Sequence, residues 1–113
     1  GYYYNISHWE VLNEIEGEHG QSPQFYTGLY DAVVTAMRAV QPSLRFVGMA
    51  LETHRNWAFW YYFLNQTNHA AGVPLDYASF HFYASPSSRT DPSAYEEMFP
   101  QCDDFVEEVA QII

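Results

Sequence analysis

Three short apolar stretches of the sequence each end on polar side chains that can transfer a proton or form hydrogen bonds. Asn13 and Glu14 follow the first stretch, Glu52 follows the second, and the third ends with His81 and Tyr83. A carboxylate can act as a general acid or base, whereas amide, imidazole and phenol groups can bind and orient a polar substrate. The pattern indicates a polar site at the ends of these stretches, with Glu14 as the candidate catalytic residue and the other four side chains as candidates for substrate binding.

Each of these side chains also has an ordinary structural interpretation. Glu14 could be a solvated carboxylate just beyond a strand, and Asn13 could end that strand as an Asx turn. His81 and Tyr83 could be core aromatic residues with one satisfied polar atom. Glu52 is a second carboxylate at a strand end, so a Glu14–Glu52 catalytic pair is an alternative to a substrate-binding role for Glu52.

The elements that would position these side chains alternate between strands and helices. The strands are expected at 2–12, 44–51 and 76–83, and the helices at 23–40, 56–68 and from 91 onward. The first stretch, which delivers Asn13 and Glu14, is expected to be a buried strand, and Pro100 is expected to kink or split the last helix. Short connectors between alternating elements predict parallel strands with right-handed crossovers.

The helix at 23–40 has the clearest signals. Ser22 and Pro23 form an N-cap followed by proline at the first helical position, and Pro42 follows the helix end. Its buried face is expected to consist of apolar residues spaced three or four positions apart, namely Phe25, Leu29, Val33, Ala36, Met37 and Val40. In the next helix, Trp57 and Trp60 are expected to pack against the core.

The polar segment 13–21 is expected to be a loop at the rim of the site. It carries Glu16, Glu18 and His19, whose spacing matches no metal-binding motif. A solvated acidic loop is therefore favoured over a metal site. Neither a metal nor a cofactor is expected.

These patterns predict an α/β fold. Functional groups gather at the carboxyl ends of the strands in β/α barrels. An open doubly wound sheet would place its site there too, but it usually shows a glycine-rich phosphate loop, which the sequence lacks. A complete barrel needs roughly 250 residues in eight units. The chain is thus expected to be a partial (β/α)8 TIM barrel of about three β/α units, with residues 1–113 forming a single partial-barrel catalytic domain.

The composition limits the class of partner. Fourteen acidic residues and four arginines give a formal charge of −10, which offers no electrostatic footprint for nucleic acid or an anionic membrane surface. Aromatic residues make up 19% of the chain, and such side chains suit the flat faces of neutral sugar rings. The sequence therefore favours a neutral partner, and a polysaccharide fits.

A few features concern the cellular compartment. Cys102 is the only cysteine, which excludes an internal disulfide and a cysteine-based zinc site. Asn5 and Asn65 begin glycosylation sequons, which would be used in a secreted protein. The sequence opens at Gly1 without an initiator Met, so the chain is expected to be a fragment with any signal peptide upstream. We expect a secreted glycoprotein.

Two runs of residues resemble a known group of enzymes. The run Trp-Glu-Val-Leu-Asn-Glu at 9–14 resembles the fourth barrel strand of retaining clan A glycoside hydrolases, especially family 39, the β-xylosidase and α-L-iduronidase group. Leu12 stands where a Trp is common in that family, and Ile15 replaces the usual Pro. The run Phe-His-Phe-Tyr at 80–83 resembles the sixth strand, so the resemblance covers nearly the whole chain as strands four to six with their helices.

The resemblance implies hydrolysis of O-glycosidic bonds in an oligosaccharide or polysaccharide by a retaining double displacement. Glu14 would be the general acid/base, and the nucleophile would be a Glu on strand seven, beyond Ile113. Asn13 would donate a hydrogen bond to the sugar 2-hydroxyl, and Tyr83 would bind the nucleophile. His81 would orient the acid/base or bind a hydroxyl. Glu52 would bind a substrate hydroxyl.

Two other functions are compatible with the sequence. The chain could belong to a carbohydrate-binding or scaffold barrel that has lost catalysis, which would lack a carboxylate on the next strand. It could also be a complete small α/β domain with a structural or interaction role. A complete domain would unfold cooperatively on heating. A barrel fragment has two open strand edges, so the isolated chain is expected to unfold without a cooperative transition and to be inactive. The oligomeric state is not indicated.

Overall fold

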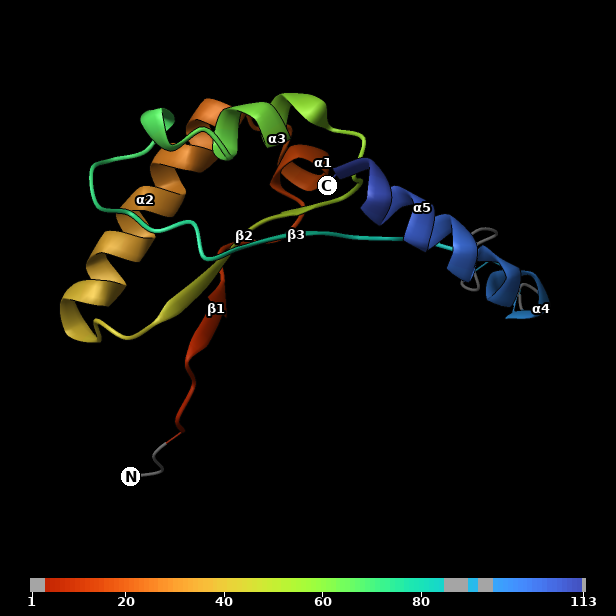
Figure 1. Cartoon of the computed structure of the whole chain (residues 1–113), viewed down its shortest axis with the longest axis horizontal. Coiled ribbons are helices and arrows are strands. Elements are labelled where there is room, and N and C mark those ends of the chain that lie inside the picture. The colour runs from red at the N-terminus through yellow and green to blue at the C-terminus, as the bar shows by residue number, and fades with distance from the viewer. Residues whose placement is uncertain (1–3, 85–89, 92–94, 113) are drawn as a thin grey trace. The chain divides into compact units, whose positions relative to one another are not determined.

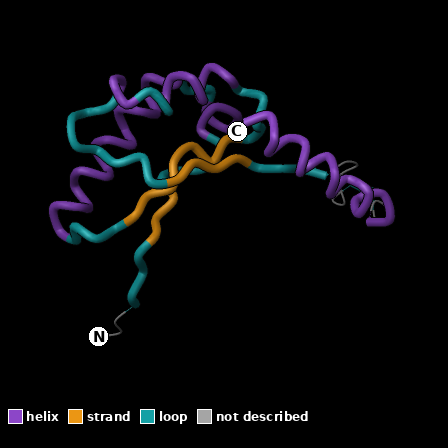
Figure 2. The backbone as a smooth tube through the Cα atoms, viewed as in Figure 1, coloured by secondary structure: helices purple, strands orange, loops and turns teal. Residues whose placement is uncertain are grey.

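The structure is a computed structural model in which residues 4–84, 90–91 and 95–112 are described, and it divides into two compact units. Unit 1 is Gly1–Phe80 and unit 2 is His81–Ile113. Two predictions fall on residues outside the described ones and stay predictions. They are the loop at 85–90, of which 85–89 are not described, and the helix start at Asp91-Pro92, of which Pro92 is not described. Figure 1 and Figure 2 show the elements of each unit.

Unit 1 contains three parallel strands with helices between them. The elements, in chain order, are β1 (His8–Glu10), α1 (Ile15–His19), α2 (Pro23–Val40), β2 (Arg45–Leu51), α3 (Trp57–Phe63), the 3-10 helix η1 (Gln66–Asn68) and β3 (Tyr77–Phe80). The strand order is β1-β2-β3, and both pairs are parallel. The prediction of parallel strands joined by helical crossovers is confirmed for these three strands.

Helices α2 and α3 cover the same face of this sheet (Figure 1). At the centre of that face, Gly48 of β2 lies against the rings of Phe63 from α3 and Tyr30 from α2. A methyl group at position 48 would overlap the Phe63 ring, so only glycine allows α3 to pack this closely. Strands that follow one another in space in their chain order, with all crossovers on one face, form a singly wound sheet.

The prediction that the first strand is buried is wrong for β1. The strand spans only His8–Glu10, and all three of its residues are exposed. In the described sheet β1 is an edge strand with one neighbour, whereas the central strand β2 is buried over most of its length. Burial in the first segment begins one residue later, at Val11.

The segment 13–21 is not an extended loop, as the sequence had suggested. Residues Ile15–His19 form the short helix α1, which ends at Gly20 in a left-handed conformation. Ile15 is the buried residue of this helix and anchors it, while Glu18 and His19 are exposed. The apolar residue at the start of an otherwise polar segment explains why it folds back onto the sheet.

Helix α2 begins and ends as predicted, but its buried face differs. The Ser22 hydroxyl accepts a hydrogen bond from the Phe25 amide, and Pro23 occupies the first turn. The expected face is mostly outside the core, since Phe25, Ala36 and Val40 are exposed. The buried residues lie on the adjacent stripe, and they are Tyr26, Thr27, Tyr30, Asp31 and Val34.

The two tyrosines of that stripe are buried because their hydroxyl groups are satisfied inside the core. The Tyr30 hydroxyl donates to the Pro74 carbonyl at 3.0 Å, and the Tyr26 hydroxyl is also hydrogen-bonded. Their rings pack on Phe63, with centroids 5.4 Å away for Tyr26 and 4.9 Å for Tyr30. Such aromatic pairs contribute beyond the burial of their area, and this favours the tyrosine stripe over the aliphatic one.

Helix α3 is shorter than predicted. It ends at Phe63, and the remainder of the expected helix forms the separate 3-10 turn η1. Trp60 is buried as predicted, and its indole Nε1 donates to the His54 carbonyl at 2.8 Å. Trp57 does not pack in the core: its ring stacks on Tyr61, and the residue remains 37% exposed.

A buried hydrogen bond joins α2 to the segment after η1. The His69 Nδ1 atom lies 2.6 Å from Asp31 Oδ1, and the His69 Nε2 atom lies 2.6 Å from the Phe63 carbonyl. The His69 ring thus bridges the Asp31 carboxylate of α2 and the Phe63 carbonyl at the end of α3. The second Asp31 oxygen accepts from the Ala70 amide, which completes the carboxylate's hydrogen bonding.

Unit 2 contains the C-terminal helices. The 3-10 turn η3 (Phe99–Gln101) separates α4 (Tyr95–Met98) from α5 (Cys102–Ile112), so the predicted break at Pro100 is confirmed. The expected strand 76–83 ends at Phe80, and His81 to Tyr83 follow it as irregular backbone. In unit 2, the ring of Phe82 contacts that of Phe105. None of the described helices has the length and apolar character needed to span a membrane.

We predict that Asp31→Asn will lower the free energy of unfolding by about 1–3 kcal/mol, because it removes a carboxylate oxygen that serves as a partner of the buried His69 ring or of the Ala70 amide. Chemical denaturation of the full-length protein measures this change. Glu18→Gln is the control, since it makes the same acid-to-amide change in the His19–Glu18 contact, where both side chains are exposed, and it should cost far less. Equal losses for the two variants would contradict the assigned importance of the Asp31–His69 pair.

Candidate active site

The structure brings three of the predicted site residues to the carboxyl ends of β1 and β2. The Glu14 amide donates to the Ala50 carbonyl at 3.0 Å, which fixes the backbone of Glu14 to the end of β2. Glu14 is half-buried, Asn13 is exposed, and Glu52 is exposed directly after β2. These side chains therefore lie at the same edge of the sheet.

A tyrosine hydroxyl is inserted between the two strands just before this edge. The strand pairing continues to the Val11 amide, which donates to the Val47 carbonyl at 3.0 Å. In a regular parallel ladder the next bond would join the Met49 amide directly to the Val11 carbonyl. Instead, the Tyr26 hydroxyl donates to the Val11 carbonyl at 3.0 Å and accepts from the Met49 amide at 2.5 Å.

The Tyr26 hydroxyl is held in its neutral form. Burial raises its pKa far above the ordinary range, and the hydrogen bond from the Met49 amide opposes this only in part. The same cause, burial, raises the pKa of Tyr30. Tyr26 therefore stays protonated at neutral pH, where it donates to the Val11 carbonyl.

The backbone at this edge is conformationally strained. Among the described residues, the non-glycine positions with positive φ are Leu12, Glu14, Met49 and Ala50. All of them lie where β1 and β2 end. Non-glycine residues in the left-handed region are uncommon and cost about 1–3 kcal/mol each. Strain of this kind is characteristic of functional sites, where surrounding contacts hold the backbone in place.

The strain on β2 belongs to a β-bulge. Gly48 pairs with Ala78 and Leu51 pairs with Phe80, so Met49 and Ala50 together oppose the single residue Ser79 of β3. The Ser79 hydroxyl accepts from the Ala50 amide at 3.1 Å and donates to Glu10 Oε1 at 2.6 Å. A bulge re-aims the side chains that follow it, here those of Glu52 and the residues beyond.

Helix α1 supports Glu52 from the other side. The Glu16 Oε1 atom accepts from the Glu52 amide at 2.6 Å, and Glu16 Oε2 is buried without a hydrogen-bond partner among the described residues. The Glu52 carboxylate lies against Gly17, where an added methyl group would overlap it. The expected role of Glu16 as part of a solvated rim is therefore wrong, because its carboxylate is a backbone acceptor that holds the end of β2.

The remaining predicted residues, His81 and Tyr83, belong to unit 2. The Tyr83 hydroxyl lies 3.5 Å from His81 Nδ1, and their rings are nearly perpendicular with centroids 6.0 Å apart. Tyr83 is exposed and His81 is half-buried. His81 is the residue that follows β3 in the sequence.

Glu14, Glu16 and Glu52 bring three carboxylates to the carboxyl edge of unit 1, and Arg55 lies in the loop that follows β2 there. Arg45, at the amino end of β2, pairs with Asp76, and this hydrogen bond raises the arginine pKa. Among the described residues no group of three or more histidine, cysteine or acidic side chains is arranged to hold a metal ion. The edge thus offers carboxylates and an amide for proton transfer and hydrogen bonding.

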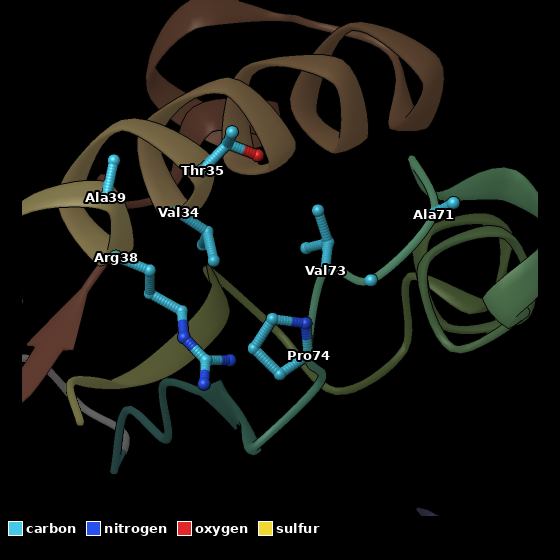
Figure 3. Close-up of a pocket in the computed structure, with 8 residues that line it drawn as sticks. Val34, Thr35, Arg38, Ala39, Ala71, Val73 and Pro74 are labelled. Atoms are coloured by element: carbon cyan, nitrogen blue, oxygen red, sulfur yellow. The ribbon is translucent and has the colours of Figure 1, made fainter. Parts of the chain in front are cut away.

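A cavity of about 300 Å³ lies near the opposite edge of the sheet (Figure 3). It separates the second half of α2 from the segment that leads into β3, and its lining is Val34, Thr35, Arg38, Ala39, Ala71, Gly72, Val73 and Pro74. The Arg38 Nε atom donates to the Pro42 carbonyl at 3.2 Å. None of the predicted site residues lines this cavity.

Comparison with protein-family models matches residues 4–113 to glycosyl hydrolases family 39. The chain belongs to this family. Searches of curated proteins and of solved structures found no match. Membership of family 39 implies glycoside hydrolase activity and a carbohydrate substrate, in agreement with the resemblance of the runs 9–14 and 80–83.

Several residues that shape this family 39 site were not identified from the sequence. Tyr26 and Ser79 hold the strand ends, and Glu10 and Glu16 accept hydrogen bonds from Ser79 and from the Glu52 amide. Glu16 carries a weak signal, because it follows Glu14 closely. Tyr26 carries none, since a tyrosine within a helix gives no sign that its hydroxyl reaches two strands.

We predict that Gly17→Ala will raise KM in the full-length enzyme while kcat changes less, because the new methyl group displaces the Glu52 carboxylate. Steady-state kinetics on an oligosaccharide substrate measure this effect, and Glu52→Gln should show it in the same direction. Gly28→Ala on α2 is the matched control, since a methyl group there meets open space. An unchanged KM in Gly17→Ala would argue against substrate binding by Glu52.

Proposed function

We propose that the chain is the central part of a retaining glycoside hydrolase, with β1, β2 and β3 as strands four to six of a (β/α)8 barrel. Family membership supports this proposal, as does the order β1-β2-β3 with α2 and α3 on one face of the sheet. That arrangement is the one that β/α barrels repeat around their axis. Residues 1–113 would then contribute one continuous segment of a single catalytic domain.

Glu14 is the proposed general acid/base. Its backbone is tied to the Ala50 carbonyl, and its side chain is half-buried at the carboxyl ends of the strands, where barrel active sites are built. In the first step Glu14 donates a proton to the leaving oxygen while a second carboxylate attacks the anomeric carbon. In the second step Glu14 takes a proton from water, which then breaks the glycosyl–enzyme bond.

The second carboxylate is proposed to be a glutamate beyond Ile113, at the end of strand seven. A retaining enzyme requires about 5–5.5 Å between its two carboxyl groups. Glu52 is the alternative partner in this chain; its amide donates to Glu16, and its exposed carboxylate lies beside Gly17 of α1. The resemblance to clan A enzymes implies a nucleophile on strand seven, which leaves Glu52 a proposed role in substrate binding.

The other predicted residues are assigned to substrate and nucleophile. Asn13 is proposed to donate to the sugar 2-hydroxyl, a bond that strengthens in the transition state. His81 is proposed to bind a hydroxyl or orient Glu14, and Tyr83 to hydrogen-bond the nucleophile. The substrate is proposed to be an oligosaccharide or polysaccharide, and the enzyme a secreted glycoprotein modified at Asn5 or Asn65.

The decisive test is Glu14→Gln in the full-length enzyme, measured on aryl glycosides with good and poor leaving groups. A poor leaving group needs the proton that Glu14 supplies, whereas a good one departs without it. We predict a loss of kcat/KM of about 10²–10⁴-fold on poor leaving groups and a much smaller loss on good ones.

Glu52→Gln provides the comparison for this experiment, because it neutralises a neighbouring carboxylate at the same edge. Its loss should be similar for both classes of leaving group. If Glu14→Gln also loses activity equally on both classes, Glu14 is not the acid/base. If the wild-type protein releases no sugar from any glycoside, the alternative function, a carbohydrate-binding or scaffold barrel without catalysis, is favoured instead.

A further inference from the structure

The feature that carries a further inference is the tyrosine hydroxyl inserted in the β1–β2 ladder. Tyr26 comes from α2, is fully buried, and reaches the sheet at the last pairing before Asn13 and Glu14. We propose that Tyr26 and Ser79 are positioning residues that set the place of Glu14 by holding the Met49–Ala50 bulge. The inference rests on the proposed function of Glu14.

The hydroxyl replaces one bond of the ladder by two. The direct bond expected between the Met49 amide and the Val11 carbonyl is absent, and the Tyr26 oxygen bridges the two groups at 2.5 Å and 3.0 Å. An oxygen atom in this place keeps the ends of the two strands further apart than a direct bond of about 2.9 Å would. The separation begins three residues before Glu14.

The position of Glu14 depends on this separation through β2. Met49, which donates to Tyr26, precedes Ala50, whose carbonyl accepts from the Glu14 amide. A shift of the Met49 amide toward Val11 would move the Ala50 carbonyl, and the Glu14 backbone with it. Because Leu12 and Glu14 already have positive φ, the segment between the two fixed points has little freedom to absorb that shift.

Ser79 holds the same bulge from the neighbouring strand. Its hydroxyl accepts from the Ala50 amide, so consecutive amides of β2 are bound by side-chain hydroxyls from α2 and β3. The Ser79 hydroxyl in turn donates to Glu10 Oε1 at 2.6 Å, and the Gly48 carbonyl is a second, longer acceptor at 3.3 Å. The bulge is thus defined by two side chains from elements on either side of it in the sequence.

The expected consequence is specific to proton donation. Displacing a catalytic group by about 1 Å costs up to about a hundredfold in rate, and a displaced acid affects poor leaving groups most. A purely structural role for the hydroxyl would lower stability without changing the dependence on the leaving group. The two roles are therefore distinguishable.

The test compares Tyr26→Phe with Tyr30→Phe in the full-length enzyme. Each substitution removes one hydroxyl from a fully buried tyrosine of α2, but Tyr30 binds the Pro74 carbonyl, away from the strand ends. For Tyr26→Phe we expect kcat/KM to fall about tenfold to a hundredfold on poor leaving groups and only a few-fold on good ones. The alkaline limb of the pH profile, which reports the protonated acid, should also shift.

Tyr30→Phe should lose a similar amount of thermal stability and keep the wild-type leaving-group dependence and pH profile. If Tyr26→Phe behaves like Tyr30→Phe in both readouts, the positioning role is overturned while the role of Glu14 stands. Should Tyr26→Phe fail to fold, Ser79→Ala decides, and a loss independent of the leaving group would overturn the proposal. Glu14→Gln is assayed alongside to tell failure of the positioning role from failure of the proposed function. If Glu14→Gln loses activity equally on good and poor leaving groups, the acid/base role of Glu14 is wrong, and the positioning role that rests on it falls too.

Discussion

The arrangement of the strand ends depends on one buried hydroxyl group. Tyr26 satisfies the Val11 carbonyl and the Met49 amide, which otherwise would pair with each other. The hydroxyl opens the β1–β2 ladder. The bulge on β2 begins at the same residue, Met49, and the positive φ values of Leu12 and Glu14 come directly after Val11. The carboxylate proposed as acid/base is therefore placed by a helix residue twelve positions later in the sequence.

The strain at this edge is compatible with a stable fold because the layer beneath it is densely packed. Tyr26, Tyr30 and Phe63 form an aromatic cluster against Gly48, and Asp31 and His69 lock α2 to the end of the α3–η1 segment. These contacts fix α2, and a fixed α2 fixes the Tyr26 hydroxyl. The helix layer thus determines the geometry at the strand ends, and the strand ends carry the functional groups.

Local signals in the sequence predicted the order of the elements well. The Ser22-Pro23 helix start, the break at Pro100 and the parallel pairing of three strands depend on nearby residues, and all are confirmed. Contacts between distant residues were not predictable. The buried stripe of α2 was misassigned because hydrogen bonds from Tyr26 and Tyr30 to remote carbonyls make tyrosine a core residue there. Glu14 stood out because it follows a strand, whereas Tyr26 and Ser79 act through partners that no spacing reveals.

The most direct test of the account is chemical rescue of Glu14→Ala by azide, assayed on a glycoside with a good leaving group. Removing the acid/base leaves the glycosyl–enzyme formed but slow to hydrolyse, because no group activates water. Azide needs no such activation, so the account predicts a large rate increase and a glycosyl azide with the anomeric configuration of the substrate. No rescue, or a glycosyl azide of inverted configuration, would contradict the assignment of Glu14 as the acid/base of a retaining enzyme.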